Sequence, residues 1–244
     1  MKKRNFNVLM ILIIIIIIGC IIILFNKREK NIYIKLNNEI QEEIKISAAS
    51  RAENNNKEQL DKYRNEYNND EIIGQISIEN SNFNMLFAKG NDNDYYLKHS
   101  INKEPNNLGA IFLDYRNDID NSKKINIYGH NNGNNGISFN YLMNYEDKEF
   151  YDNHKRIIIS SDQKDYIFEI FSIQIVDGSS NYIHMQVDFN NKDEWENYIN
   201  KVLANSLYKD DIDMSNTKKL LTLQTCTNRI DWQLLLINAR LIEE

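Results

Sequence analysis

The chain has 244 residues, 42% hydrophobic and 26% charged, which fits a globular protein with one large domain or two small ones. Eight Gly and one Pro exclude collagen-like and Pro-rich disordered proteins, and two Cys exclude a disulfide framework. Four histidines without paired ligand spacing predict no metal site, and we expect no cofactor. Residues 31–244 carry 23 basic and 34 acidic side chains, so nucleic acid is an unsuitable partner.

The first predicted element is an apolar segment at residues 8–25, which holds no charge. Eighteen helical residues span roughly 27 Å, enough to cross a bilayer core. Basic residues precede the segment and favour a cytoplasmic tail at residues 1–7, although others follow it. A cleaved signal peptide is the alternative, but the run is long and no small-x-small site follows. We therefore predict a single-pass transmembrane anchor with the rest of the chain outside the cell.

Residues 26–69 are predicted to form a stalk and an N-terminal helix. Apolar residues recur every fourth position from residue 32 to residue 44, which gives one narrow apolar stripe on a helix. Such a helix would lift the body off the membrane and pack on its side.

The remainder, residues 70–244, is predicted to be one domain rich in strands. Short β-branched and aromatic runs separated by Asn, Asp and Gly turns indicate an all-β barrel or sandwich. The candidate strands are residues 72–78, 83–87, 110–113, 125–128, 156–160, 166–176, 219–226 and 232–242. Two helices interrupt them, at residues 138–151 and 193–207, the second with a clear amphipathic stripe.

Cys226 is the one cysteine outside the predicted anchor, and it stands where a strand-like run meets a polar turn. His130 stands in an equivalent place, because the run INIYGH leads into a Gly/Asn loop. A cysteine nucleophile needs a partner that passes protons near neutral pH, and histidine is suited to that role. The pattern leaves two interpretations open: a catalytic pair, or a loop histidine and an incidental thiol.

Several segments, taken together, resemble class B sortases. TLQTC resembles the family's TLxTC signature, and YGHN resembles the loop that carries its histidine. In chain order, NDEIIGQISI, DNDYYLKH, LGAIFLDYRN, FNYLMNYEDKEFYDNH, FEIFSIQIVD and WENYINKVLANS also resemble successive family segments. The resemblance covers residues 70–244 and implies a sortase barrel of about eight strands with added helices.

The resemblance also implies an activity. A sortase B-type cysteine transpeptidase cleaves a C-terminal sorting signal, of the NPxTx or PxTG type, after Thr. It then transfers the protein to an amine of cell-wall peptidoglycan in a Gram-positive organism. The expected partners are surface proteins with such a signal, the peptidoglycan amine and the membrane.

The implied site residues are Cys226 as nucleophile and His130 as general acid/base. The family's arginine, which helps to hold the oxyanion, aligns with Leu234, so this chain departs from the pattern. Arg229 is the predicted substitute, because it follows the cysteine closely. Gln233 could substitute in part, whereas Arg240 is interpreted as a strand charge.

Three further residues are predicted to contact substrate: Thr225, Gln224 and Tyr182. Gln224 stands where the family often has Ser. Arg116 is interpreted as part of a structural ion pair. Two other functions remain open: a catalytically impaired sortase-like module that binds sorting signals, motivated by the missing arginine, and another kind of cysteine peptidase.

Overall fold

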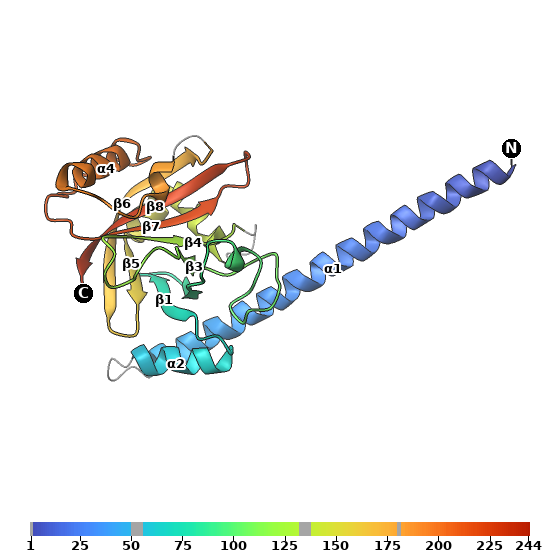
Figure 1. Ribbon diagram of the computed structural model, residues 1–244, viewed down its shortest axis with the longest axis horizontal. Coiled ribbons are helices and arrows are strands. Elements are labelled where there is room, and N and C mark those ends of the chain that lie inside the picture. Colours follow the sequence, from blue (N-terminus) through green and yellow to red (C-terminus); the bar gives the residue numbers. More distant parts are fainter. Residues whose placement is uncertain (1, 50–55, 132–137, 180–181) are drawn as a thin grey trace.

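The computed structural model describes residues 2–49, 56–131, 138–179 and 182–244, with side chains described outside 2–9, 11–12, 43–49 and 182–183. Its centre is a closed barrel with strand order β1-β2-β3-β4-β7-β8-β6-β5 (Figure 1). The strands are β1 (Ile72–Ile78), β2 (Asn84–Ala88), β3 (Phe112–Leu113), β4 (Lys124–Tyr128), β5 (Arg156–Ser160), β6 (Asp165–Asp177), β7 (Leu220–Cys226) and β8 (Gln233–Glu243). The prediction of an all-β barrel with about eight strands is confirmed.

The pairing of β4 with β7 positions the residues of interest. These strands are parallel and in register from Lys124 opposite Leu220 to Tyr128 opposite Gln224. β8 pairs antiparallel with β7 and places Leu234 opposite Cys226. Because parallel strands end at the same edge of a sheet, the residues that follow Tyr128 and Gln224 emerge together.

The barrel interior is packed with aliphatic and aromatic side chains, and one close approach depends on glycine. A Cβ atom at Gly74 of β1 would lie 2.5 Å from the Phe87 ring and 2.8 Å from the Ser160 carbonyl oxygen. Any larger residue there would push Phe87, which is fully buried, out of the core.

The first interrupting helix differs from its prediction. Residues 138–151 were expected to be one helix, but the structure has a 3₁₀ helix, η2 (Phe139–Glu146), and a separate α3 (Lys148–Asn153). The break lies at Asp147, whose backbone is extended and whose carboxylate accepts a hydrogen bond from the Phe150 N–H. Asp favours this capping position over a helix interior, which explains the interruption.

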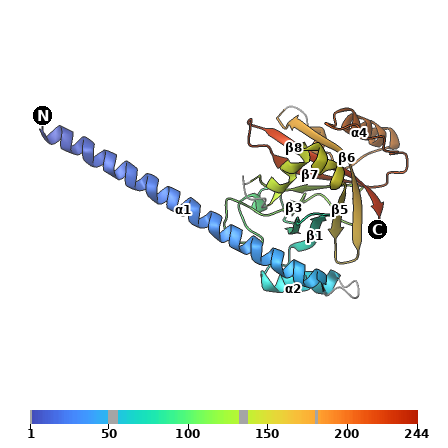
Figure 2. The ribbon, with the colours of Figure 1, turned by 180° about the vertical axis from the view of Figure 1, so that it is seen from behind.

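The second helix, α4 (Lys192–Ala204), lies at the outside of the barrel (Figure 2). Asn191 caps it by accepting a hydrogen bond from the Glu194 N–H, and Trp195, Tyr198, Ile199 and Val202 are buried. They pack with Phe171 of β6, so the predicted apolar stripe is the face turned to the barrel. Two short 3₁₀ turns complete the body: η1 (Tyr95–Leu97) and η3 (Tyr182–Met185).

The N-terminal region is one long helix, α1 (Lys2–Ala49), that leaves the barrel as a rod, with α2 (Asn56–Glu66) beside its end (Figure 1). Tyr33, Asn37 and Ile40 are buried, so this part of α1 packs on the body. The buried face follows the predicted stripe only in part, because Ile32 is exposed. Within the described residues, no helix combines the length and the apolarity needed to cross a membrane. The membrane span predicted at residues 8–25 is therefore not supported by the described part of α1.

Candidate active site

A cleft of about 360 Å³ opens at the barrel edge where β4 and β7 end. It brings together Cys226 and His130, the two residues for which the sequence predicts chemistry. Gln224, Thr225 and Leu234 also line it. The remaining lining residues are Asn93, Asp94, Leu97, Phe112, Tyr128, Gly129 and Met185.

Cys226 is the last residue of β7 and is exposed to solvent. Neighbouring residues at the end of the barrel nevertheless partly shield its sulfur from water, and this desolvation raises the pKa of the Cys226 thiol above its ordinary value. Desolvation disfavours the charged thiolate. At neutral pH the residue is therefore mainly a thiol, and it needs a base to become a nucleophile.

His130 follows the end of β4 and is half-buried. Its Nε2 lies 2.9 Å from the carbonyl oxygen of Leu97 in η1. Because a carbonyl only accepts, Nε2 carries the proton, and Nδ1 is the nitrogen of the neutral ring that can take one up. The ring fits because Gly109, at φ 64°, has no Cβ, which would lie 2.9 Å from His130 Cδ2.

Arg229 lies outside the lining of the cleft, at an ion pair. Its Nη1 and Nη2 donate to the two carboxylate oxygens of Glu146 in η2, at 3.0 and 2.8 Å. This two-pronged geometry is the strong form of an arginine–carboxylate contact. To donate to an oxyanion at Cys226, the guanidinium would have to leave Glu146.

The position opposite the nucleophile is apolar, because Leu234 lines the cleft there. Gln233, the other predicted donor, is outside the lining, and its Oε1 accepts a hydrogen bond from the Thr227 hydroxyl at 2.8 Å. Arg240 lies further along β8 and pairs with Glu169 at 2.7 Å. No described arginine lines the cleft.

Gln224 and Thr225, both predicted to contact substrate, line the cleft, and each has a side-chain oxygen without a hydrogen-bond partner among the described residues. Gln224 Oε1 and Thr225 Oγ1 are buried and have no hydrogen-bond partner among the described residues. Buried polar atoms in folded proteins are nearly always paired, so unpaired ones beside a reactive thiol suit an incoming ligand. Tyr182 belongs to η3, but its side chain lies outside the described residues.

Sequence reasoning missed other cleft residues, above all Met185 and Asp94. Asp94 belongs to the segment DNDYYLKH, which was noted for its family resemblance without a role for this residue. Met185 follows Tyr182 by three positions in η3, and an apolar residue in a polar loop was the available signal. Arg116 forms the expected structural ion pair, with Nη2 2.6 Å from Asp114 Oδ2.

Comparison with known proteins assigns the family. Residues 76–242 match the sortase domain. The chain belongs to the sortase family. It is 30% identical to sortase B of Listeria monocytogenes over 166 residues, 68% of this chain and 66% of that protein. It is 29% identical to sortase B of Staphylococcus aureus over 159 residues, 65% of this chain and 64% of that protein.

The chain also resembles solved structures of class B sortases. The crystal structure of Clostridium perfringens sortase B matches with a TM-score of 0.69 and 30% identity, covering 75% of this chain and all of that one. The aligned part spans just under two thirds of the length of the two relatives, so the region outside it carries no argument from likeness.

Proposed function

We propose that this sortase is a cysteine transpeptidase that cleaves a C-terminal sorting signal after Thr and transfers the protein to a peptidoglycan amine. One observation carries the proposal: Cys226 and His130 line the same cleft at the common end of β4 and β7. A thiol and an imidazole in one cleft supply a nucleophile and a proton carrier, the two groups that acyl transfer requires.

In the proposed reaction, the Cys226 sulfur attacks the carbonyl carbon of the signal's Thr, and the thiol proton passes to His130. The tetrahedral intermediate collapses, the peptide C–N bond breaks, and His130 returns the proton to the leaving amine. A thioester then joins the protein to Cys226. The peptidoglycan amine attacks it, His130 takes the amine proton, and the thiol is restored as the new amide bond forms.

Holding the oxyanion and binding the peptide both need further groups. The oxyanion must be held by Arg229 released from Glu146, by an amide such as that of Gln233, or by backbone N–H groups near Cys226. Gln224 and Thr225 offer unpaired acceptor oxygens to N–H or O–H groups of the bound peptide, and Tyr182 in η3 is a third candidate contact.

We further propose that residues 8–25 anchor the protein in the cell membrane, with residues 1–7 in the cytoplasm and the barrel outside. The support is the uncharged eighteen-residue run preceded by Lys2, Lys3 and Arg4. Accessibility of the barrel to protease in intact cells tests this arrangement. Protection from added protease would contradict it.

The enzymatic proposal is tested with fluorogenic peptides that carry NPxTx or PxTG signals, incubated with the full chain and a small amine. We expect cleavage after Thr and, with the amine present, a ligated product identified by mass spectrometry. Cleavage after another residue, or none with any signal peptide, would contradict the proposal.

Two observations favour a second function: Leu234 opposite Cys226 is apolar, and Arg229 is engaged by Glu146. A sortase-like module without an oxyanion donor would bind a sorting signal without cleaving it. Saturable binding of the same peptides without turnover, measured by fluorescence anisotropy, would favour this function.

A further inference from the structure

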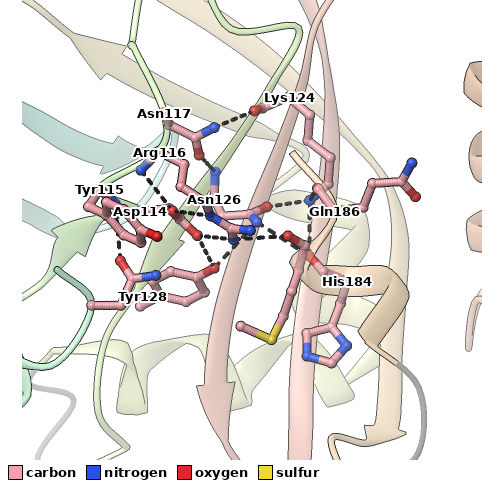
Figure 3. A network of polar contacts seen from close by, with 11 residues as sticks. Asp114, Tyr115, Arg116, Asn117, Lys124, Asn126, Tyr128, His184 and Gln186 are labelled. Carbon is pink, nitrogen blue, oxygen red and sulfur yellow. Dashed lines mark hydrogen bonds and ion pairs between the residues drawn. The ribbon is translucent and has the colours of Figure 1, made fainter. Parts of the chain in front are cut away.

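A lysine is completely buried behind the wall of the cleft. Lys124, the first residue of β4, has 0% of its surface exposed. Its Nζ donates to the carbonyl oxygens of His184, at 3.0 Å, and Gln186, at 2.9 Å, and to Asn126 Oδ1 (Figure 3). An ammonium group has three N–H donors, so these contacts use all of them.

The carbonyl between those two is held by a second cation. Arg116 donates from Nη2 to the carbonyl oxygen of Met185 at 3.0 Å, while it pairs with Asp114. Asn126 Nδ2 also lies 3.4 Å from the His184 carbonyl oxygen. Three consecutive carbonyls, at residues 184–186, are therefore fixed to the barrel by side chains from β4 and the preceding loop.

The same network reaches the cleft on both sides. Met185, whose backbone is held, lines the cleft together with Cys226. Tyr128, at the end of β4, also lines it, and its hydroxyl donates to Asp114 Oδ2 at 2.7 Å (Figure 3). The position of this wall relative to the thiol thus depends on Lys124 and Arg116.

The buried ammonium is costly for the fold itself. No described carboxylate lies within ion-pair distance of Lys124 Nζ. Desolvation lowers the pKa of Lys124 to about 7; Asp114 opposes that shift and Arg116 adds to it. The three oxygens and the face of the Tyr198 ring, 5.4 Å away, also offset part of the lost hydration. Replacing Lys124 with an apolar residue would leave those three oxygens without this donor, so the lysine is tied to the position of residues 184–186.

We propose that Lys124 is a positioning residue that, with Arg116, holds residues 184–186 so that Met185 forms a fixed wall of the peptide-binding cleft. The inference rests on the proposed function, because it takes the cleft's ligand to be a sorting-signal peptide. A wall of this kind contacts substrate before and during the reaction. Its loss therefore raises KM with little change in kcat.

The chain offers a matched control in Lys219, a second buried lysine. Its Nζ donates to the carbonyl oxygens of Ile119 and Asp120, and desolvation likewise lowers the pKa of Lys219. Lys219 directly precedes β7, whereas Cys226 is the last residue of that strand, so the two residues lie at opposite ends of β7. Lys219 does not line the cleft. Lys219→Met therefore removes a buried lysine without touching residues 184–186.

The test compares full-length Lys124→Met, Lys219→Met and unaltered protein. We expect Lys124→Met to raise KM for the signal peptide about tenfold, the effect of losing one well-packed contact, with kcat within about twofold. Hydrogen exchange at the amides of residues 184–188 should quicken in Lys124→Met and stay unchanged in Lys219→Met. Lys124→Gln, which keeps two N–H donors, should restore part of both properties.

Several outcomes would overturn the inference. One is a folded Lys124→Met protein with the KM and the exchange rates of the unaltered chain. Another is an equal rise of KM in Lys219→Met, which would indicate general destabilisation. If Lys124→Met does not fold, Arg116→Lys replaces it, since lysine keeps the charge beside Asp114 but lacks the fork that also reaches Met185. Unchanged exchange and KM in Arg116→Lys would then refute the inference.

Failure of the proposed function gives a different result. In that case the unaltered chain does not cleave the peptide. The exchange comparison, which needs no substrate, still decides whether Lys124 holds the wall.

Discussion

The two ends of β7 and β8 differ in how their polar groups are satisfied. At one end, Lys219 donates to two carbonyls, and Arg240 is paired with Glu169 and with the Asp213 carbonyl. At the other end, Cys226 is exposed, and Gln224 Oε1 and Thr225 Oγ1 have no partner among the described residues. One end is saturated and stabilises the barrel, while the other keeps unmet hydrogen-bonding capacity for a ligand.

The largest expected effect follows from removing the thiol at the unsaturated end. Cys226→Ala should lower peptide cleavage by at least about 10⁴-fold, because no other described group of the cleft can form the thioester. The thermal unfolding midpoint should stay near that of the unaltered chain, since the side chain is exposed. Cys20→Ala is the control and should cleave normally. Cleavage that survives in Cys226→Ala would end the proposed mechanism.

Substitutions of Arg229 test whether a guanidinium from outside the cleft lining stabilises the oxyanion at the Cys226 end of the barrel. If it holds the oxyanion, Arg229→Ala should lose about 100–1000-fold in kcat, and Arg229→Lys should recover little. Glu146→Gln, which weakens the ion pair and frees the guanidinium, should then preserve or raise kcat. Near-normal turnover in Arg229→Ala with a large loss in Gln233→Ala would transfer the role to the amide.

His130 tests the proton transfer. His130→Ala should lose at least about 100-fold in rate, the usual contribution of a positioned acid or base. The pH–rate profile of the unaltered enzyme should be bell-shaped, with limbs that belong to the Cys226–His130 pair jointly. His154→Ala, a histidine outside the cleft, serves as control. A loss of only a few-fold would leave His130 as a loop residue.

The raised pKa of Cys226 predicts how the free thiol reacts. Because burial disfavours the thiolate, the thiolate is a minor form at neutral pH, and its fraction grows about tenfold per pH unit below the pKa. Alkylation by iodoacetamide, followed by mass spectrometry, should therefore accelerate steadily from pH 6 to pH 8. A rate already constant across this range would instead indicate a thiolate paired with protonated His130.

The smallest effect is expected at the saturated end. Arg240→Ala should lower the free energy of unfolding by about 1 kcal/mol, because it breaks a partly exposed ion pair. Turnover should hardly change. Denaturant unfolding and peptide cleavage measure the two quantities, and a large loss of turnover would mean that the two ends are coupled.

Much of the barrel could be predicted because strand signals are local. Each of the eight predicted ranges overlaps an observed strand, since β-branched runs bounded by Asn and Gly turns disfavour other structures. The predicted range 125–128 does not include Lys124, the first residue of β4. Its partners lie about 60 residues away, beyond any local pattern.

The site divides in the same way. Cys226 and His130 each stand at the end of a strand-like run, so their own neighbours indicated them as candidates, and the resemblance to class B sortases supplied their roles. The parallel pairing of β4 with β7, which brings them into one cleft, is a property of the closed sheet. The contact of Arg229 with Glu146 joins residues 83 positions apart, and no spacing rule could have predicted it.

The continuity of α1 has a consequence for the direction in which the cleft faces. Its first described buried residue is Tyr33, so roughly thirty residues, about 45 Å of helix, separate the N-terminus from the barrel. Each residue of an α-helix adds about 100° of rotation and 1.5 Å of rise. Inserting one residue between positions 26 and 32 would therefore turn the cleft by more than a quarter circle about the rod while hardly raising it. The direction in which Cys226 faces about the axis of α1 therefore depends on the number of residues in a helical segment that does not contact it.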